Sequence, residues 1–568
     1  MMRILIRLLY FGILISCILI FSTPATASVL YVGSGGYSSI QSAVNASSPG
    51  DTVVVAPGLY NENVIVKVSD LLLISEEFQT SGTVTKDTTQ LNASGLGNAV
   101  EIKADGVIFR GFTVHNYTLG ISIENCSAVI DNCIIYNTGI TGVNPRGIEA
   151  YLEQASQAFV EITNNEIYDN TRSDYWLSSG GRGINVSSNK AGELCTVFID
   201  NNTIYGNDQR GISVAHVSTT ITNNFLHDNG VYLMNRTYNV GIVLVFNKGN
   251  VLIQDNTIIN VQAGNPVYAG GIYLFADTKP GYGYEPGYYG TITIDSNIID
   301  TGSCAPGISL NGPNDETFDI YITNNTISGT TVIPWSSEEL GGLYVWNMNT
   351  SYIAYVDVIE NNTLTDNNIG LFVRRTDVGS LRNNNIYGND NFGAYYHKKP
   401  IQGYLDATLN WWGDESGPSG GVSDPLTGTP AEGNGDSVSA NILFDPWLQA
   451  PYSELIPIEI DIKPGSDPNS INIKSKGRIP VAVLTTPSFD AASVDTETVR
   501  FGRTGSEAPA VHSALEDIDA DGDLDLILHF KREETGIQCG DNAAYLTGKT
   551  FSTESFEGSD AVKITGCK

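Results

Sequence analysis

The sequence predicts an all-β protein in which short strands stack into a long solenoid, followed by a smaller β-domain. Two interleaved phrases carry this prediction. One, with Asn between apolar residues, recurs nine times from residue 129 to residue 386, and the other begins with Gly and recurs ten times from residue 120 to residue 396. Such repeats cannot bury an apolar face alone, so neighbouring repeats must stack. At 568 residues, the chain is long enough for a solenoid and a further domain.

The first phrase marks a bend between strands. One copy reads Ile199-Asp-Asn-Asn-Thr-Ile-Tyr-Gly-Asn207. The central Asn of successive copies falls at residues 132, 165, 202, 224, 256, 297, 325, 362 and 384, and the shortest step is 22 residues. Asn tolerates a left-handed backbone, and a stacked amide can bond its equivalent in the next coil. We therefore expect this one Asn both to shape the bend and to link the coils.

The second phrase marks a strand with one buried face. Gly211-Ile-Ser-Val and Gly271-Ile-Tyr-Leu are typical copies. Apolar residues that alternate with a period of two are the pattern of such a strand. The inward Ile, Leu and Val side chains are expected to fill the centre of a tube.

The two phrases resemble the right-handed parallel β-helix superfamily, which includes pectate lyases and polygalacturonases. The resemblance covers residues 28–450 and implies about 10–12 coils. The segment Tyr31–Val44 is similar to the family's opening, where a helix caps the tube. Leu409–Pro418 and Phe444–Trp447 resemble its closing coil. Capping matters because an open sheet end invites aggregation.

The N-terminus predicts export. Arg3 and Arg7 precede an apolar run from Leu8 to Phe21, and small residues follow, so residues 1–27 are expected to be a signal peptide. An uncleaved anchor and a lipoprotein signal ending at Cys17 are the alternatives. No later segment is apolar enough to span a membrane. We expect a secreted or cell-surface protein without a membrane span after cleavage.

The charge balance excludes one class of partner. The chain has 30 Lys and Arg against 62 Asp and Glu, a formal net charge of -32. Such a surface repels a phosphate backbone, so nucleic acid is not an expected partner. It suits a secreted protein or one that collects cations.

The repeats end before Pro451, and a different sequence pattern follows. Residues 456–568 contain short apolar runs between Pro, Gly and Asp, which predicts a small β-sandwich-like domain. This region resembles an accessory module of secreted microbial proteins, which implies attachment or display. Cys539 and Cys567 lie within it and are the expected disulfide of an exported protein.

The same region contains an acidic loop, Asp517-Ile-Asp-Ala-Asp-Gly-Asp-Leu-Asp525. Alternate carboxylates around one Gly form the oxygen-rich site that calcium prefers. The predicted calcium ligands are Asp517, Asp519, Asp521, Asp523 and Asp525. Because an EF-hand count reaches Leu528 where it needs Glu, the loop resembles dockerin or FG-GAP-type loops instead. A solvated acidic turn is the alternative.

Three arginines precede the repeat Gly on successive coils: Arg146, Arg182 and Arg210. Equivalent residues of a β-helix lie one strand spacing apart, so these guanidinium groups are expected to repel one another. A column of this kind needs anions.

Two sources of anions remain open. Asp169, Asp174 and Asp208 could form internal salt bridges with the arginines. Alternatively, the arginines bind the carboxylates or sulfates of an acidic polysaccharide, with Tyr175 and Trp176 stacked on its sugar rings.

Flat side chains form two further candidate sites. One column follows the Asn phrase and contains His115, Tyr136, Tyr168, Tyr205, His227 and Tyr387. It is either a structural stack or a glycan platform. A loop exposes four more rings for glycan contact, Tyr282, Tyr284, Tyr288 and Tyr289.

Three functions remain open. The first is a non-catalytic surface protein that binds a polysaccharide, an envelope glycan or other surface proteins, with calcium in its C-terminal module. The second is a calcium-dependent lyase or epimerase for uronate polymers that uses Arg182, Arg210, Asp169 and Asp174 as catalytic residues. The third is a structural surface-layer subunit. Because the polygalacturonase signatures Gly-His-Gly and Arg-Ile-Lys are absent, a two-carboxylate glycosidase is disfavoured.

Overall fold

The structure is a computed structural model. It describes residues 27–92, 97–139, 145–153, 157–171, 180–188, 195–230, 239–245, 249–261, 269–275, 290–312, 318–332, 340–347, 354–397, 403–453, 455–551 and 554–567. Apart from Ala27, the predicted signal peptide lies outside these ranges. Within them, no helix combines the length and hydrophobicity that a membrane crossing requires.

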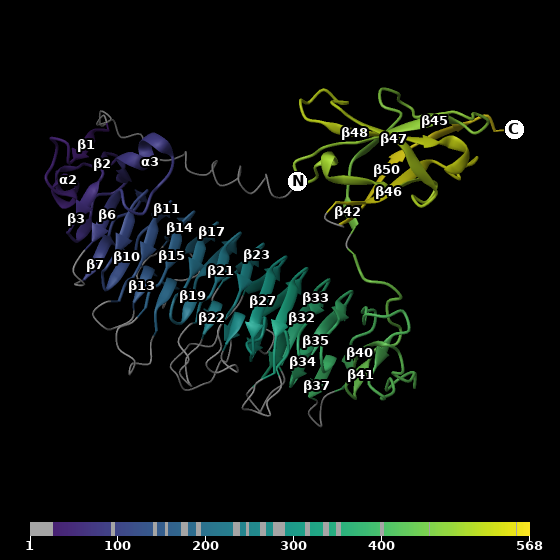
Figure 1. Cartoon of the computed structure of the whole chain (residues 1–568), viewed down its shortest axis with the longest axis horizontal. Coiled ribbons are helices and arrows are strands. Elements are labelled where there is room, and N and C mark those ends of the chain that lie inside the picture. The colour runs from purple at the N-terminus through teal and green to yellow at the C-terminus, as the bar shows by residue number, and fades with distance from the viewer. Residues whose placement is uncertain are drawn as a thin grey trace.

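Most of the described chain forms three long parallel sheets, which make up the faces of a tube (Figure 1). The first sheet contains β1 (Val29–Val32), β2 (Thr52–Val55), β5 (Leu72–Ser75), β8 (Val107–Arg110), β11 (Ala128–Asp131), β14 (Phe159–Thr163), β17 (Thr196–Asp200), β20 (Ser218–Thr222), β23 (Val251–Gln254), β26 (Gly290–Asp295), β29 (Phe318–Thr323), β32 (Ala354–Glu360) and β35 (Thr376–Arg382).

The second sheet contains β3 (Gly58–Tyr60), β6 (Thr89–Asn92), β9 (Thr113–His115), β12 (Ile134–Tyr136), β15 (Glu166–Tyr168), β18 (Thr203–Tyr205), β21 (Phe225–His227), β24 (Thr257–Ile259), β27 (Ile298–Ser303), β30 (Thr326–Thr330), β33 (Thr363–Thr365) and β36 (Asn385–Tyr387). The third sheet contains β4 (Val64–Val66), β7 (Asn98–Ile102), β10 (Leu119–Glu124), β13 (Arg146–Tyr151), β16 (Arg182–Ser187), β19 (Arg210–Ala215), β22 (Val240–Val245), β25 (Gly270–Phe275), β28 (Ile308–Asn311), β31 (Leu343–Trp346), β34 (Ile369–Arg374) and β37 (Phe392–His397).

Each coil contributes one strand to each sheet, and the strands of successive coils pair in parallel. The sheets have 13, 12 and 12 described strands, which confirms the predicted parallel β-helix at the upper end of its expected length. Inward side chains such as Ile184 and Val186 are buried in one continuous core. The repeat Gly is required where coils approach closely: a Cβ on Gly183 would lie 2.7 Å from the backbone oxygen of Gly211.

The central Asn of the first phrase forms a ladder along the tube. From Asn165 to Asn410, each side-chain amide donates to the side-chain oxygen of its equivalent one coil later, at 2.9–3.0 Å. In one step of this asparagine ladder, Asn202 donates to Asn224. These amides are buried, so the ladder satisfies polar groups inside the tube.

The expectation that one Asn both shapes the bend and links the coils is wrong. The left-handed residue is the one before the ladder position: φ is 53° at Asn201 and 54° at Asn223. Asn132 is likewise left-handed, with φ of 51°, and Cys133 occupies the ladder position beside it. Two neighbouring residues therefore divide the roles, since a left-handed bend and an inward-pointing amide need different positions.

Both ends of the tube are covered. Helix α2 (Ile40–Ala46) buries Ile40, Ala43 and Val44 against the core, as predicted for the N-terminal cap. A second helix, α3 (Glu76–Ser81), follows β5. The short strands of the closing coil are β38 (Leu405–Asp406), β39 (Pro418–Ser419), β40 (Gly435–Ser437) and β41 (Ile442–Leu443). Trp412 is fully buried there.

The C-terminal region is a separate β-sheet region (Figure 1). Its elements are β42 (Leu455–Pro457), β43 (Ile460–Ile462), β44 (Ser470–Asn472), β45 (Arg478–Val483), η3 (Ala491–Ser493), β46 (Val494–Gly502), β47 (Ala508–Glu516), β48 (Asp525–Lys531), η4 (Arg532–Glu534), β49 (Ala543–Thr550), β50 (Ser555–Ala561) and β51 (Lys563–Thr565). Eight strands form one sheet in the order β42-β50-β49-β46-β47-β48-β45-β43, and β44 pairs with β51.

This eight-stranded sheet folds back on itself. The backbone N–H of Ile462, in terminal strand β43, donates to Asp560 Oδ2 in β50 at 2.9 Å. Side chains from both halves share one core, in which Phe501 and Phe530 lie 4.9 Å apart between ring centroids. The fold therefore matches the sandwich-like domain that the sequence predicts.

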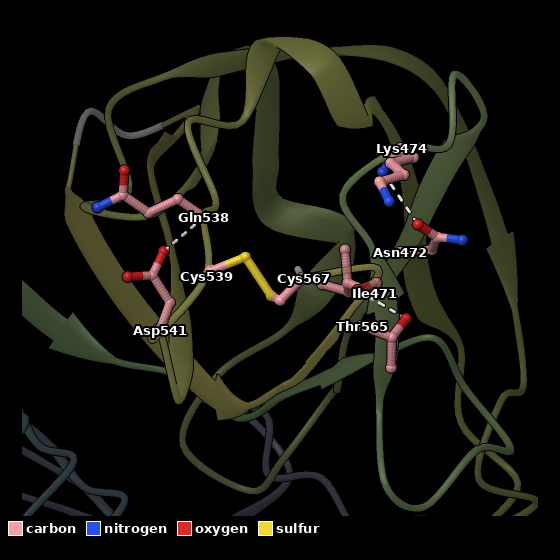
Figure 2. The surroundings of a disulfide bond; sticks show 8 residues. All are labelled: Ile471, Asn472, Lys474, Gln538, Cys539, Asp541, Thr565 and Cys567. Atoms are coloured by element: carbon pink, nitrogen blue, oxygen red, sulfur yellow. Dashed lines mark hydrogen bonds between the residues drawn. A yellow bond between two sulfur atoms is a disulfide. The ribbon is translucent and has the colours of Figure 1, made fainter.

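A disulfide joins Cys539 to Cys567, the pairing that the sequence predicts. Figure 2 shows it between the loop that carries Asp541 and the end of β51. Thr565 in β51 also donates to the backbone oxygen of Ile471 in β44 at 3.3 Å. The last strand is thus held on both sides.

Candidate functional site

The three arginines lie side by side on the third sheet. In the parallel register, Arg146 is the partner of Arg182, and Arg182 is the partner of Arg210. Neighbouring strands lie about 4.8 Å apart, so three guanidinium groups follow one another at that spacing. We call this set the arginine ladder.

Each arginine bonds the side chain three residues later on its own strand. These pairs are Arg146 with Glu149 in an ion pair, Arg182 Nη1 with Asn185 Oδ1 at 2.5 Å, and Arg210 Nη1 with Ser213 Oγ at 3.1 Å. Sequence analysis missed all three partners. The signal that identifies them is the recurring Arg-Gly-Ile-x, in which the side chain of x contacts the arginine.

The ladder carries more positive than negative charge. Burial lowers the pKa of the Arg182 guanidinium well below its ordinary range, and the charges of Arg210 and Arg146 lower it further, while Glu149 raises it. Glu149 is already paired with Arg146, and both side chains are mostly buried, with 17% and 20% exposed. Within the described ranges, Arg182 forms no ion pair.

Of the three aspartates expected beside the ladder, Asp169 is influenced by a lysine and not by an arginine. Asp169 is an exposed corner residue after β15, with a left-handed φ of 50°. Burial raises its pKa and the charge of Lys86, not of an arginine, lowers it. Asp208 is buried in the segment between β18 and β19. Asp174, together with Tyr175 and Trp176, lies outside the described residues.

The flat side chains of the second sheet stack face to face. The ring stack contains His115, Tyr136, Tyr168, Tyr205 and His227, with successive centroids 4.9, 5.0, 4.7 and 4.7 Å apart and planes within 7° of parallel. Lys86 Nζ lies 4.1 Å from the Tyr136 centroid. Because the ring faces pack on one another, the geometry favours a structural stack over a sugar platform.

A second set of rings, which sequence analysis missed, lies on the outward face of the third sheet. The aromatic row contains Tyr273, Tyr344, Phe372 and Tyr395, in register with Ser213 through the parallel strands. Phe372 lies 5.1 Å from Tyr344 and 5.2 Å from Tyr395 between centroids. Tyr344 and Phe372 are buried, whereas Tyr395 is partly exposed. The row occupies the C-terminal coils, beyond the arginine ladder.

The acidic loop joins β47 to β48 and brings three of its five carboxylates together. One carboxylate oxygen from each of Asp517, Asp519 and Asp525 lies within 4.8 Å of the others. Asp521 and Asp523 fall outside this acidic trio. The turn between them needs Gly522, whose φ is 103°.

The acidic trio has the donors that a hard cation requires. Asp525 is fully buried, and its oxygens accept from the backbone N–H of Thr485 at 2.8 Å and of Ile518 at 2.9 Å. Desolvation raises the pKa of Asp519, and the charges of Asp521 and Asp525 raise it further. The residues therefore fit calcium chemically.

The four tyrosines of residues 282–289 lie outside the described residues.

Comparisons with known proteins agree with this architecture. A family model described as right handed beta helix region matches residues 89–264 and 146–354. Similar solved structures include an alginate lyase from Paenibacillus sp. str. FPU-7, 15% identical over 59% of this chain and 94% of that chain, with a TM-score of 0.37.

Two further structures are similar at this level. The A-module of the Azotobacter vinelandii mannuronan C-5 epimerase AlgE6 is 13% identical over 72% of this chain and 94% of its own, with a TM-score of 0.34. The Dettilon tailspike protein is 11% identical over 87% and 88%, with a TM-score of 0.35. No curated protein matches the chain in sequence. The family match and the three long parallel sheets together show a right-handed parallel β-helix fold.

Proposed function

We propose that this protein binds an acidic polysaccharide along the outward face of its third sheet and does not cleave it. The observation that carries the proposal is Arg182. This partly buried guanidinium lies between two other arginines and has no carboxylate partner within the described ranges. A charge buried without an opposite charge is costly, so the site is complementary to an anion.

The ligand chemistry follows from the side chains. Guanidinium groups bind carboxylates and sulfates through paired N–H donors. The ladder repeats at the strand spacing of about 4.8 Å, so it suits a polymer with repeated negative groups better than a single small anion. Farther along the same face, the partly exposed Tyr395 of the aromatic row offers a ring for contact with a sugar.

Binding without cleavage is favoured by the carboxylates near the ladder. A calcium-dependent lyase needs carboxylates that hold calcium beside a free base. Glu149 is engaged with Arg146, and the charge that acts on Asp169 is that of Lys86. These surroundings support binding over cleavage.

Calcium and export are part of the same proposal. The acidic trio offers three oxygens to calcium, which would relieve the repulsion among the loop's charges and hold the turn between β47 and β48. An exported protein with a net charge of -32 meets both calcium and polysaccharides outside the cell.

The test measures binding by calorimetry. Residues 28–568, with calcium, are titrated with polygalacturonate and with neutral dextran. We expect binding to polygalacturonate only, and a loss of at least about tenfold in affinity in Arg182→Gln combined with Arg210→Gln. Arg382→Gln, an exposed arginine on the first sheet, is the matched control. Unchanged affinity in the double variant contradicts the proposal, and new absorbance from unsaturated sugar ends identifies a lyase.

A further inference from the structure

The C-terminal region has a basic surface at one end of its sheet. We define the basic end as Lys474, Lys476, Arg478, Lys531 and Arg532. All but Arg532, which is partly exposed, are exposed. Strand β48 begins at Asp525 of the acidic loop and ends at Lys531, so about 20 Å of strand separates the two charged ends.

Like charges face one another across this end. Arg478 and Lys531 are direct partners in the antiparallel pair of β45 and β48, so their side chains lie on the same face. Like charges directly opposite one another destabilise a sheet. Lys531 Nζ forms an ion pair with Glu534 Oε1 at 2.7 Å. Within the described ranges, Lys474, Lys476 and Arg478 form no ion pair. These three exposed side chains are therefore available to an external anion.

The charge of Arg478 reaches a neighbouring histidine of the sheet. His529 lies on the same face of β48, and its ring centroid is 5.4 Å from that of His512 in β47. Burial lowers the pKa of His529, and its interactions with His512 and Arg478 lower it further, while Glu516 raises it. The basic end therefore acts electrostatically on the middle of the strand.

The basic turn is held rigidly. Arg532 Nε donates to the backbone oxygen of Ser475 at 2.8 Å, which ties the turn to the end of β48. The backbone N–H of Lys474 donates to Asn472 Oδ1 at 2.9 Å, close to the strand that the disulfide holds (Figure 2). A fixed array of charges loses less entropy on binding than a flexible one.

We propose that the basic end is a second polysaccharide-binding surface, which attaches the C-terminal region to an acidic glycan independently of the arginine ladder. Five basic side chains spread over a turn and a strand pair match a polymer with spaced negative groups. Double-stranded DNA, with one charge per about 1.7 Å, is repelled more strongly by a chain of net charge -32.

The experiment uses residues 28–568 with calcium and a fluorescent polygalacturonate oligomer, followed by anisotropy at low and at high salt. The starting protein is Arg182→Gln with Arg210→Gln, which removes the ladder. We expect salt-sensitive binding to remain, and Lys474→Glu with Lys476→Glu to weaken it at least about tenfold. Lys549→Glu with Lys563→Glu makes the same change in charge at exposed sites elsewhere in the module.

The outcomes separate the two surfaces. Loss of binding only with Lys474→Glu and Lys476→Glu supports the basic end, even if the ladder variant binds as well as the original protein. Equal loss in both pairs, or no residual binding in the ladder variant, overturns the basic end and leaves the ladder untouched. Binding to anionic lipid vesicles but not to the oligomer also overturns it.

Discussion

The side-chain amide of Asn202 donates to the side-chain oxygen of Asn224, 22 residues later in the chain and one coil along the tube, at 2.9 Å. Asn224 Oδ1 also accepts from the backbone N–H of Asn202 at 3.0 Å. Asn224 Nδ2 donates in turn to Asn256 and to the backbone oxygen of Ile199. One buried side chain thus satisfies polar groups of three successive coils, so the asparagine ladder stabilises the stacking of the coils.

Asn224→Gly is therefore expected to lower the free energy of unfolding by about 3–4 kcal/mol, because it leaves several buried donors and acceptors without partners. Asn223→Gly is the matched control, since Gly adopts the left-handed φ of 54° and the Asn223 side chain is exposed. We expect a change of less than about 1 kcal/mol there. Urea unfolding followed by circular dichroism measures both, and equal effects contradict the division of roles.

Cys133 occupies the ladder position one coil before Asn165, the first Asn of the asparagine ladder. Its sulfur lies 3.4 Å from the backbone oxygen of Asp131 and 3.9 Å from that of Phe109, where a ladder Asn places its amide. Cys133→Asn is expected to hold or raise the free energy of unfolding by about 1 kcal/mol, and Cys133→Ala to lower it. If Cys133→Asn unfolds more easily than Cys133→Ala in urea, the coil at β12 does not accept a ladder residue.

Arg182→Gln is expected to lower the affinity for polygalacturonate without lowering the stability of the protein. Removing an uncompensated positive charge from the arginine ladder should keep or raise the free energy of unfolding by about 1 kcal/mol, while affinity for polygalacturonate falls. Thermal unfolding and calorimetry on the same sample measure the two effects. A purely structural role for Arg182 predicts the opposite, a less stable protein.

Calcium is expected to raise the unfolding temperature of the C-terminal region in a pH-dependent way. The pKa values of Asp519 and Asp523 lie above their ordinary value of 3.8, so the folded loop favours protonation. Without calcium, the stability that this protonation provides is present at low pH and is lost as the pH rises through those raised pKa values.

The stabilisation by calcium should therefore be full at neutral pH and disappear as the pH falls towards about 4. Scanning calorimetry with calcium and with a chelator measures it. Asp519→Asn should reduce the calcium effect, and Asp467→Asn, an exposed aspartate outside the loop, should not. A calcium effect that is the same in both variants removes the acidic trio as the site.

Much of the architecture was predictable because it depends on local periodicity. Alternation after each repeat Gly assigns Ile184 and Val186 to the core, and the shared position before the repeat Gly places Arg146, Arg182 and Arg210 in one column. The cap helix followed from the family resemblance, and the disulfide from two Cys that share the last segment of an exported protein. A repeat reports which positions are equivalent, and equivalence in a solenoid means contact.

The repeat could not predict the direction of each side chain at the bend between two strands. The division between the left-handed Asn201 and the ladder Asn202 depends on one backbone angle, and the phrase contains both residues side by side. The selection of three carboxylates out of five in the acidic loop likewise depends on how the turn at Gly522 aims them.

The sequence by itself determined that the chain is a stacked β-solenoid with a charged column, because repeated spacing fixes which residues recur on neighbouring coils. Only the tertiary structure decided which charges interact: Arg146 pairs with Glu149, the charge of Lys86 acts on Asp169, and Arg182 forms no ion pair within the described ranges. The reason is physical. Spacing along a chain sets strand register, whereas ion pairing depends on side-chain direction and burial over a few ångströms, which only the packed coils establish.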